Sequence, residues 1–155
     1  MIRIAVVDDD REEVQELCDL LQFTSLELQE PYTIETFYSG SEFLAQYRKQ
    51  YELLCLDIDM PEKDGMAVAE EIRRRDSKVL IMFITHMAQM AIRGYEVQAV
   101  DFVLKPVSKY ALLLKMQRIR KSLSQRKEAF FLVPDDGGVR KISSRELYYV
   151  EVSGH

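Results

Sequence analysis

The sequence has few cysteines and no long apolar run, and both features narrow the class of protein. Cys18 and Cys55 are its only cysteines, and each lies inside an apolar pattern. Two such thiols do not form a disulfide framework, so we expect reduced core cysteines in a cytoplasmic protein. No apolar run approaches the ~20 residues of a membrane span, so we expect no membrane association. Asp8 and Asp9 turn the N-terminus acidic too early for a signal peptide.

What the chain contains is an ordinary globular composition with an uneven distribution of charge. Hydrophobic residues make up 47% of the chain and charged residues 30%, which is typical of a soluble domain. Residues 1–104 carry 21 acidic and 10 basic side chains, whereas residues 105–155 carry 5 acidic and 11 basic ones. A basic tail on an acidic body indicates an anionic partner. A solvated helix face followed by a linker would explain the tail equally well.

Short apolar runs alternate with amphipathic patterns through residues 1–122. The first helix begins at Asp10, whose spacing from Glu13 fits a capping box. The fourth helix, over 88–97, has the weakest pattern. We predict strands over 2–7, 32–38, 52–56, 79–84 and 100–104, each followed by a helix. Strands joined in this way need right-handed crossovers, so we predict an α/β fold with a doubly wound five-stranded parallel sheet.

The pattern changes after the last predicted helix, which covers 107–122. Residues 123–128 are polar and are predicted to continue that helix as a linker. The sequence Pro134-Asp135-Asp136-Gly137-Gly138 lies between two apolar runs and predicts a β-hairpin. Another strand is expected over 147–152. Because residues 129–155 fall far short of a typical domain of ~100 residues, we interpret them as the truncated start of a second, β-rich domain.

The carboxyl ends of the predicted strands carry most of the reactive side chains. Asp8 and Asp9 follow the first strand, Asp57 the third, Thr85 the fourth and Lys105 the fifth. Open α/β sheets bind their ligands at this edge. Clustered carboxylates repel one another unless a cation lies between them, and hard oxygen ligands select Mg²⁺ or Mn²⁺. With the metal, Thr85 and Lys105 could neutralise phosphoryl oxygens while Asp57 attacks phosphorus to form an acyl phosphate.

Each of these polar residues has a simpler explanation when it is taken alone. Asp10 can be a helix cap, Asp59 and Asp64 can be turn residues, and Thr85 can be an ordinary hydroxyl at a strand end. Their occurrence together, in order on alternating strands, is what points to a shared site.

Residues 1–122 resemble a CheY-like receiver domain of two-component response regulators along their whole length. By this resemblance, Asp57 is the phosphoacceptor, Asp9 a direct metal ligand, and Asp8 a ligand that acts mainly through water. The metal would also contact Asp57 and the backbone carbonyl of Asp59. The motifs that carry the resemblance are Val6–Asp9, Leu56–Pro61 with Asp64-Gly65, Thr85, and Phe102–Pro106.

The resemblance also implies a switch and its partners. Lys105 contacts the phosphoryl group, and the Lys105-Pro106 peptide bond is expected to be cis. Thr85 would turn to the phosphate, and Phe102 would swing inward behind it. A sensor histidine kinase would supply the phosphoryl group. A further expectation is homodimerisation through the surface formed by the helix over 88–97, the strand over 100–104 and the helix over 107–122.

The sequence departs from the common receiver pattern after Thr85. His86 stands where receivers usually have a small residue. Its bulk could hinder the approach of water to the acyl phosphate, which predicts a long-lived phosphoryl state. A solvated loop histidine without effect is the alternative. The switch position holds Phe102 rather than tyrosine, so it lacks a hydroxyl for an outward hydrogen bond.

The segment 129–155 resembles the beginning of a LytTR-type DNA-binding domain. Phe131–Val133, Val139–Ile142 and Arg145–Glu151 fit the first strands of that family, and Ala91–Val97 resembles receivers that precede such domains. The resemblance implies transcription regulation through a full-length output domain. Because the loops that read DNA mostly lie further along, the segment by itself is not expected to bind a specific sequence.

The residues allow two other functions besides that of a response regulator. Asp57-Ile58-Asp59 also resembles the nucleophile and acid pair of haloacid-dehalogenase-type phosphatases. That family usually carries the pair on an early strand, with later acidic ligands and often a cap, whereas Asp8 and Asp9 come first here. A receiver that works without phosphorylation is the third reading, against which the complete set of residues argues. We therefore expect a signalling protein and not a turnover enzyme.

Overall fold

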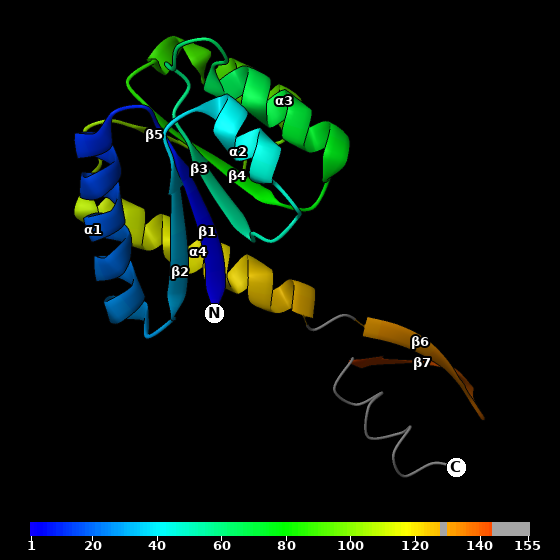
Figure 1. Cartoon of the computed structure of the whole chain (residues 1–155). Helices are drawn as coiled ribbons and strands as arrows, with labels where there is room; N and C mark the ends of the chain where they lie inside the picture. Colours follow the sequence, from blue (N-terminus) through cyan, green and yellow to red (C-terminus); the bar gives the residue numbers. More distant parts are fainter. Residues whose placement is uncertain (128–129, 144–155) are drawn as a thin grey trace. The chain divides into compact units, whose positions relative to one another are not determined.

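A five-stranded parallel sheet forms the centre of the first part of the chain (Figure 1). Its spatial order is β2-β1-β3-β4-β5, which makes it a CheY-like, doubly wound α/β sheet as predicted. The strand order reverses between β1 and β3, where such sheets bind ligands. The strands are β1 (Ile2–Val7), β2 (Tyr32–Phe37), β3 (Leu53–Leu56), β4 (Leu80–Thr85) and β5 (Asp101–Leu104).

The computed structural model describes residues 1–127 and 130–143. The chain divides into two compact units, Met1–Met116 and Gln117–His155. The sheet belongs to the first unit and a β-hairpin to the second. Within the described residues, no helix is long and apolar enough to cross a membrane.

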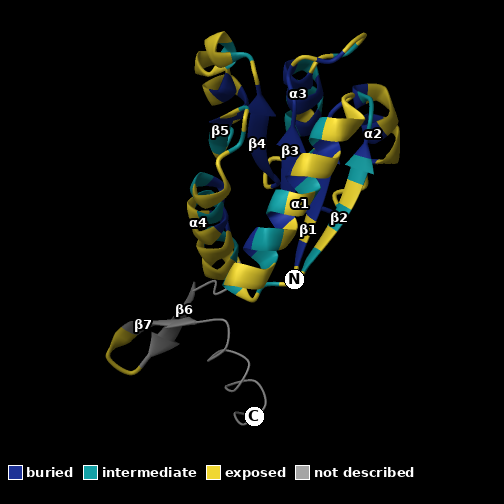
Figure 2. Cartoon of the chain, turned by 90° about the vertical axis from the view of Figure 1, so that its left-hand side faces the viewer, coloured by how far each residue is buried: buried dark blue, intermediate teal, exposed yellow. Residues whose placement is uncertain are grey.

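Helices cover both faces of the sheet. On one face lie α1 (Arg11–Leu28) and the beginning of α4 (Lys109–Lys127), which meet where the rings of Phe23 and Tyr110 contact edge to face at 6.2 Å. On the other face lie α2 (Gly40–Gln46) and α3 (Gly65–Arg75). Strands covered on both sides are apolar throughout, and β3 and β4 are buried along their whole lengths (Figure 2).

The core contains both aliphatic and aromatic side chains. Phe43, Phe83 and Met66 are almost fully buried between the sheet and the α2–α3 layer. Full burial of one such side chain stabilises the fold by about 1.5–3 kcal/mol. Cys55 is buried in β3 and Cys18 is half-buried in α1, and both are free thiols. Burial raises the pKa of each thiol, which keeps them protonated.

The weak helix predicted over 88–97 is helical in the structure, but it is not a continuous α-helix. The segment instead forms two 3₁₀ helices, η1 (Ala88–Met90) and η2 (Ile92–Val97), and no side chain caps either of them. In η2 only Gly94 and Val97 are buried, three residues apart, which matches the period of a 3₁₀ helix. Ile92 and Tyr95 are 80% and 84% exposed. The segment thus lacks the apolar stripe that would hold an α-helix against the sheet.

The N-terminus of α1 is capped by Asp10, as predicted. Its Oδ1 accepts hydrogen bonds from the backbone N–H groups of Glu12 (3.0 Å) and Glu13 (3.2 Å). The Glu13 side chain contacts Lys105 and His86 instead of closing the capping box.

Removing the Asp10 cap should cause a modest loss of stability. Asp10→Ala should lower the free energy of unfolding by about 1 kcal/mol, because two N–H groups lose their acceptor. Urea denaturation measures the loss. Asp10→Asn is the control, since asparagine caps almost as well, and equal losses for the two variants would contradict the role of the cap.

The second unit contains a two-stranded antiparallel hairpin of β6 (Phe130–Asp135) and β7 (Gly138–Ser143). Asp135 pairs with Gly138, so the turn is shorter than the predicted 134–138. Gly138 has φ of +136°, a conformation open mainly to glycine. The strand expected over 147–152 lies outside the described residues. The boundaries at 122 and 128 remain predictions, and α4 continues to Lys127.

Candidate functional site

Two buried aspartates stand side by side at the carboxyl ends of β1 and β3. The backbone N–H of Asp57 donates to the carbonyl of Val7 (3.0 Å), and the N–H of Asp8 donates to that of Phe37 (3.1 Å). Each strand ladder therefore continues one residue past its strand and fixes the position of a carboxylate. The side chains of Asp8 and Asp57 are both almost completely buried.

Asp9 completes a cluster of three carboxylates. One oxygen each from Asp8, Asp9 and Asp57 lies within 4.8 Å of the others, and Asp9 is the exposed member. Hard, anionic oxygens at this spacing suit a small divalent cation such as Mg²⁺. The donor set therefore fits the metal site expected from the sequence.

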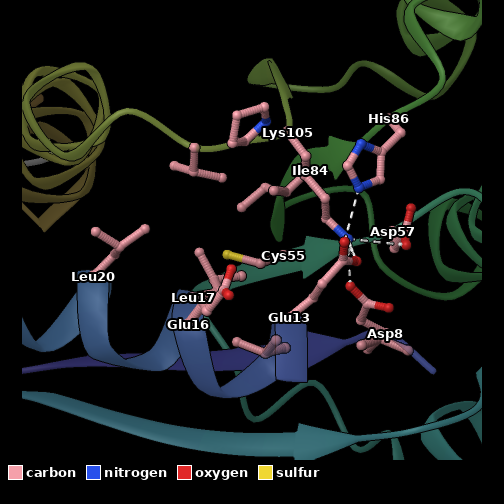
Figure 3. A pocket seen from close by; sticks show the side chains of 14 residues that line it. Asp8, Glu13, Glu16, Leu17, Leu20, Cys55, Asp57, Ile84, His86 and Lys105 are labelled. Carbon is pink, nitrogen blue, oxygen red and sulfur yellow. Dashed lines mark hydrogen bonds and ion pairs between the residues drawn. The ribbon is translucent and has the colours of Figure 1, made fainter. Parts of the chain in front are cut away.

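Lys105 brings the opposite charge into the cluster from the end of β5. Its backbone N–H donates to the carbonyl of Thr85 (2.9 Å), which extends the pairing of β4 with β5. Its Nζ donates to Oδ2 of Asp8 (2.6 Å), to Oδ2 of Asp57 (3.2 Å) and to Glu13 (Figure 3). The side chain is only 8% exposed. Burial by itself would lower the pKa of Lys105, but the bonds to Asp8 and Glu13 outweigh it and raise that pKa.

Glu13 is a member of the site that the motif analysis missed. Its carboxylate reaches from the first turn of α1 to the Lys105 ammonium, and its Oε1 lies 2.8 Å from Nε2 of His86. These two contacts hold the pKa of Glu13 below its usual value against the opposing effect of burial. The capping-box spacing accounts for Glu13 within its own helix, and no local pattern in the sequence indicates a partner on another element.

Burial and the neighbouring negative charge perturb the pKa of Asp8. Burial raises the pKa of Asp8 to about 6, and the nearby charge of Asp57 adds to this. Hydrogen bonds from Lys105 and from the backbone of Asp10 oppose the shift without cancelling it. A bound cation would relieve the same repulsion.

The loop after Asp57 forms one wall of the entrance. The N–H of Asp59 donates to Oδ1 of Asp57 (3.2 Å), while the Asp59 side chain is exposed. Asp64 caps α3 by accepting from the N–H of Ala67 (2.8 Å), as its turn-residue reading allowed. A cavity of about 510 Å³ opens above Asp57 and is lined by Asp9, Asp10, Glu13, Asp57, Asp59, Met60, Pro61 and His86. An anionic ligand that reached Asp57 through this cavity would pass several acidic side chains.

Comparison with known protein families decides what this arrangement is. Residues 4–117 match the model of the response regulator receiver domain. The chain belongs to this family.

Relatives of this receiver include named signalling proteins. The sensory transduction protein LytT of Oceanobacillus iheyensis is 33% identical over 129 residues, which are 81% of this chain and 51% of that protein. The LytT protein of Bacillus subtilis is 29% identical over 78% of this chain and 49% of its own length. The chain thus spans about half the length of these curated relatives. The non-phosphorylated HemR receiver domain of Leptospira biflexa superposes with a TM-score of 0.66 at 29% identity, over 77% of this chain and 94% of that one.

The two residues expected to switch the receiver lie on neighbouring strands. Thr85 is fully buried, and its Oγ1 accepts from the N–H of Met87 (3.3 Å). Phe102 is half-buried, and its ring lies 6.1 Å from that of Phe83. The peptide bond between Lys105 and Pro106 is cis.

Beside Phe102 the surface is hollow. A cavity of about 440 Å³ is lined by Ala91, Ile92, Gly94, Tyr95, Ala99, Val100, Asp101 and Phe102. An inward movement of the Phe102 ring would change the shape of this surface, which connects β5 to η2.

Proposed function

We propose that this receiver accepts a phosphoryl group on Asp57 from a sensor histidine kinase, in a reaction that requires Mg²⁺. The observation that supports this most is the position of Asp57. Its carboxylate belongs to the three-carboxylate cluster, accepts a hydrogen bond from the Lys105 ammonium, and lines an open cavity. Mg²⁺, when bound, would neutralise phosphoryl oxygens.

The residues around Asp57 suit an in-line transfer. One Asp57 carboxylate oxygen attacks phosphorus, and the bond from phosphorus to the donor breaks, so that the donor leaves with the electron pair. Lys105 is already charged and needs no proton transfer to bind the new phosphoryl oxygens. Asp8 and Asp9 hold the metal, and the buried Thr85 hydroxyl can turn to the phosphate.

Incubation with acetyl phosphate and Mg²⁺ tests this function. Intact-mass analysis should show a single phosphoryl group on the wild type, none on Asp57→Asn, and none in excess EDTA. A phosphatase of the haloacid-dehalogenase type would instead release phosphate over many turnovers without accumulating the phosphorylated form. Absence of both products would contradict the proposal.

We further propose that the switch acts on an output of the LytTR type. Support comes from the relatives named LytT and from the β-hairpin at 130–143. In this proposal η2, β5 and α4 form the dimer surface. Exposed apolar side chains on these elements, such as Ile92, Tyr95 and Leu104, would be covered in the dimer.

A chain extended beyond His155 to the length of these relatives tests the output. It should bind promoter DNA more tightly after phosphorylation, whereas residues 1–155 should bind no specific sequence. Sedimentation before and after phosphorylation measures the dimer, and a monomer in both states would contradict the dimer surface.

We expect His86 to lengthen the lifetime of the phosphorylated state. Its ring is 61% exposed and lines the same cavity as Asp57. His86→Ala should speed the loss of phosphate from Asp57 severalfold, because water then has freer access to phosphorus. Phosphate decay after removal of the donor measures this, with Gln89→Ala on the exposed η1 as the control. Unchanged decay in His86→Ala would contradict this role of the histidine.

A further inference from the structure

Every donor of the Lys105 ammonium is in use. An ammonium group has three N–H donors, and in this structure they face Asp8, Asp57 and Glu13. A phosphoryl oxygen can bind Lys105 only where one of these acceptors gives way or shares its donor. Asp8 belongs to the metal-ligand cluster and Asp57 is the proposed nucleophile, so both are needed in place.

Glu13 is the acceptor whose place in the reaction is unassigned. It lies outside the three-carboxylate cluster, and it comes from α1 instead of a strand end. Its negative charge partly neutralises the ammonium that the phosphoryl group would need, and it lines the cavity through which an anion would arrive. The Glu13 side chain is only 26% exposed, so its charge is screened less than that of a fully exposed carboxylate.

We propose that Glu13 is a positioning residue that competes with the phosphoryl group for Lys105. This inference rests on the proposed phosphorylation of Asp57. In the unphosphorylated receiver, Glu13 holds Lys105 and raises the concentration of phosphoryl donor needed to fill the site. Phosphorylation displaces the Glu13 carboxylate from Lys105.

His86 determines where Glu13 lies. A carboxylate only accepts hydrogen bonds, so Nε2 of His86 donates to Oε1 while Oε2 faces Lys105. The side chain of Glu13 is thus held between α1, the end of β5 and the loop after β4 (Figure 3). The contact joins α1, which begins shortly after Asp8 and Asp9, to the loop that follows the switch residue Thr85. Displacement of Glu13 would therefore change the contacts of both α1 and the loop after β4.

Beryllofluoride, which mimics a phosphoryl group, provides the test. Isothermal titration calorimetry in saturating Mg²⁺ measures its affinity for the wild type and Glu13→Gln. Glutamine keeps the size of the side chain and removes the charge. Binding to Glu13→Gln should be about tenfold tighter, as expected for the loss of one poorly screened like charge. A purely structural role for Glu13 would weaken binding instead.

Two further variants separate contact from charge. Glu27→Gln removes an exposed acidic side chain near the other end of α1 and should leave the affinity unchanged. Glu13→Asp keeps the charge but is one methylene shorter, so it should lose the contact with Lys105 and bind beryllofluoride with an affinity between those of the wild type and Glu13→Gln. Wild-type affinity in Glu13→Asp would contradict a competition for the Lys105 donor.

The remaining outcomes distinguish this inference from the function on which it rests. If the wild type binds Mg²⁺ but no beryllofluoride, the proposed phosphorylation fails. If the wild type binds beryllofluoride and Glu13→Gln binds it no more tightly, only the role of Glu13 is overturned. Weaker binding of both Mg²⁺ and beryllofluoride by Glu13→Gln would overturn it too, because Glu13 would then support the metal site.

Discussion

Replacing Lys105 by methionine should destabilise the metal-free receiver by about 3 kcal/mol, the typical loss when one partner of a buried ion pair is removed. The Lys105 side chain is 8% exposed, and it is paired with Asp8 and Asp57, which are 7% and 6% exposed. Methionine has a similar length and no charge. It would leave these carboxylates close together without the cation that compensates their burial.

The stability of the Lys105→Met variant should depend strongly on Mg²⁺. With Lys105 absent, the metal is the remaining source of positive charge in the cluster, so Mg²⁺ should stabilise Lys105→Met more than the wild type. Urea denaturation with EDTA and with saturating Mg²⁺ measures both effects. Lys115→Met removes a more exposed pair, Lys115–Asp101 at 2.9 Å, and should cost less than about 1 kcal/mol. Equal losses in the two variants, or no response to Mg²⁺, would contradict this account of Lys105.

The strand ends could be predicted from the sequence because parallel strands impose a simple rule. Apolar runs place β1, β3, β4 and β5 in the sheet, and the residue after each run lies at the same edge. Asp8, Asp57 and Lys105 therefore meet in the structure, although 48 and 97 positions separate Lys105 from the two aspartates. Local pattern was sufficient here because the sheet itself converts sequence position into spatial position.

Glu13 and the 88–97 segment could not be predicted in the same way. Glu13 has a helix-capping pattern within α1, but its actual partners, Lys105 and His86, lie 92 and 73 positions away. The 88–97 segment contains enough helix-forming residues to suggest an α-helix, yet only Gly94 and Val97 of η2 find a buried environment. In both places the deciding interactions are tertiary, and no local pattern encodes them.

The tight loop after Asp57 makes Gly65 the glycine whose replacement should be most costly. The N–H of Gly65 donates to the carbonyl of Ile58 (2.9 Å), which folds the loop back on the end of β3. A Cβ at this position would lie 2.0 Å from the backbone oxygen of Asp57 and 2.7 Å from its carbonyl carbon. Backbone atoms cannot move aside as a flexible side chain can, so the start of α3 and the end of β3 would have to separate.

Gly65→Ala should therefore lower the free energy of unfolding by at least about 3 kcal/mol and reduce phosphorylation of the fraction that folds. Urea denaturation measures the first effect, and the acetyl phosphate reaction, corrected for the folded fraction, measures the second. Gly94→Ala is the matched control: Gly94 is also buried in a short helix, but its new Cβ would be 3.7 Å from the nearest atom, an ordinary contact. Gly94→Ala should be neutral or slightly stabilising. Similar stability in the two variants would mean that the loop can move away from Asp57, and the acceptor would then be held less rigidly than its contacts indicate.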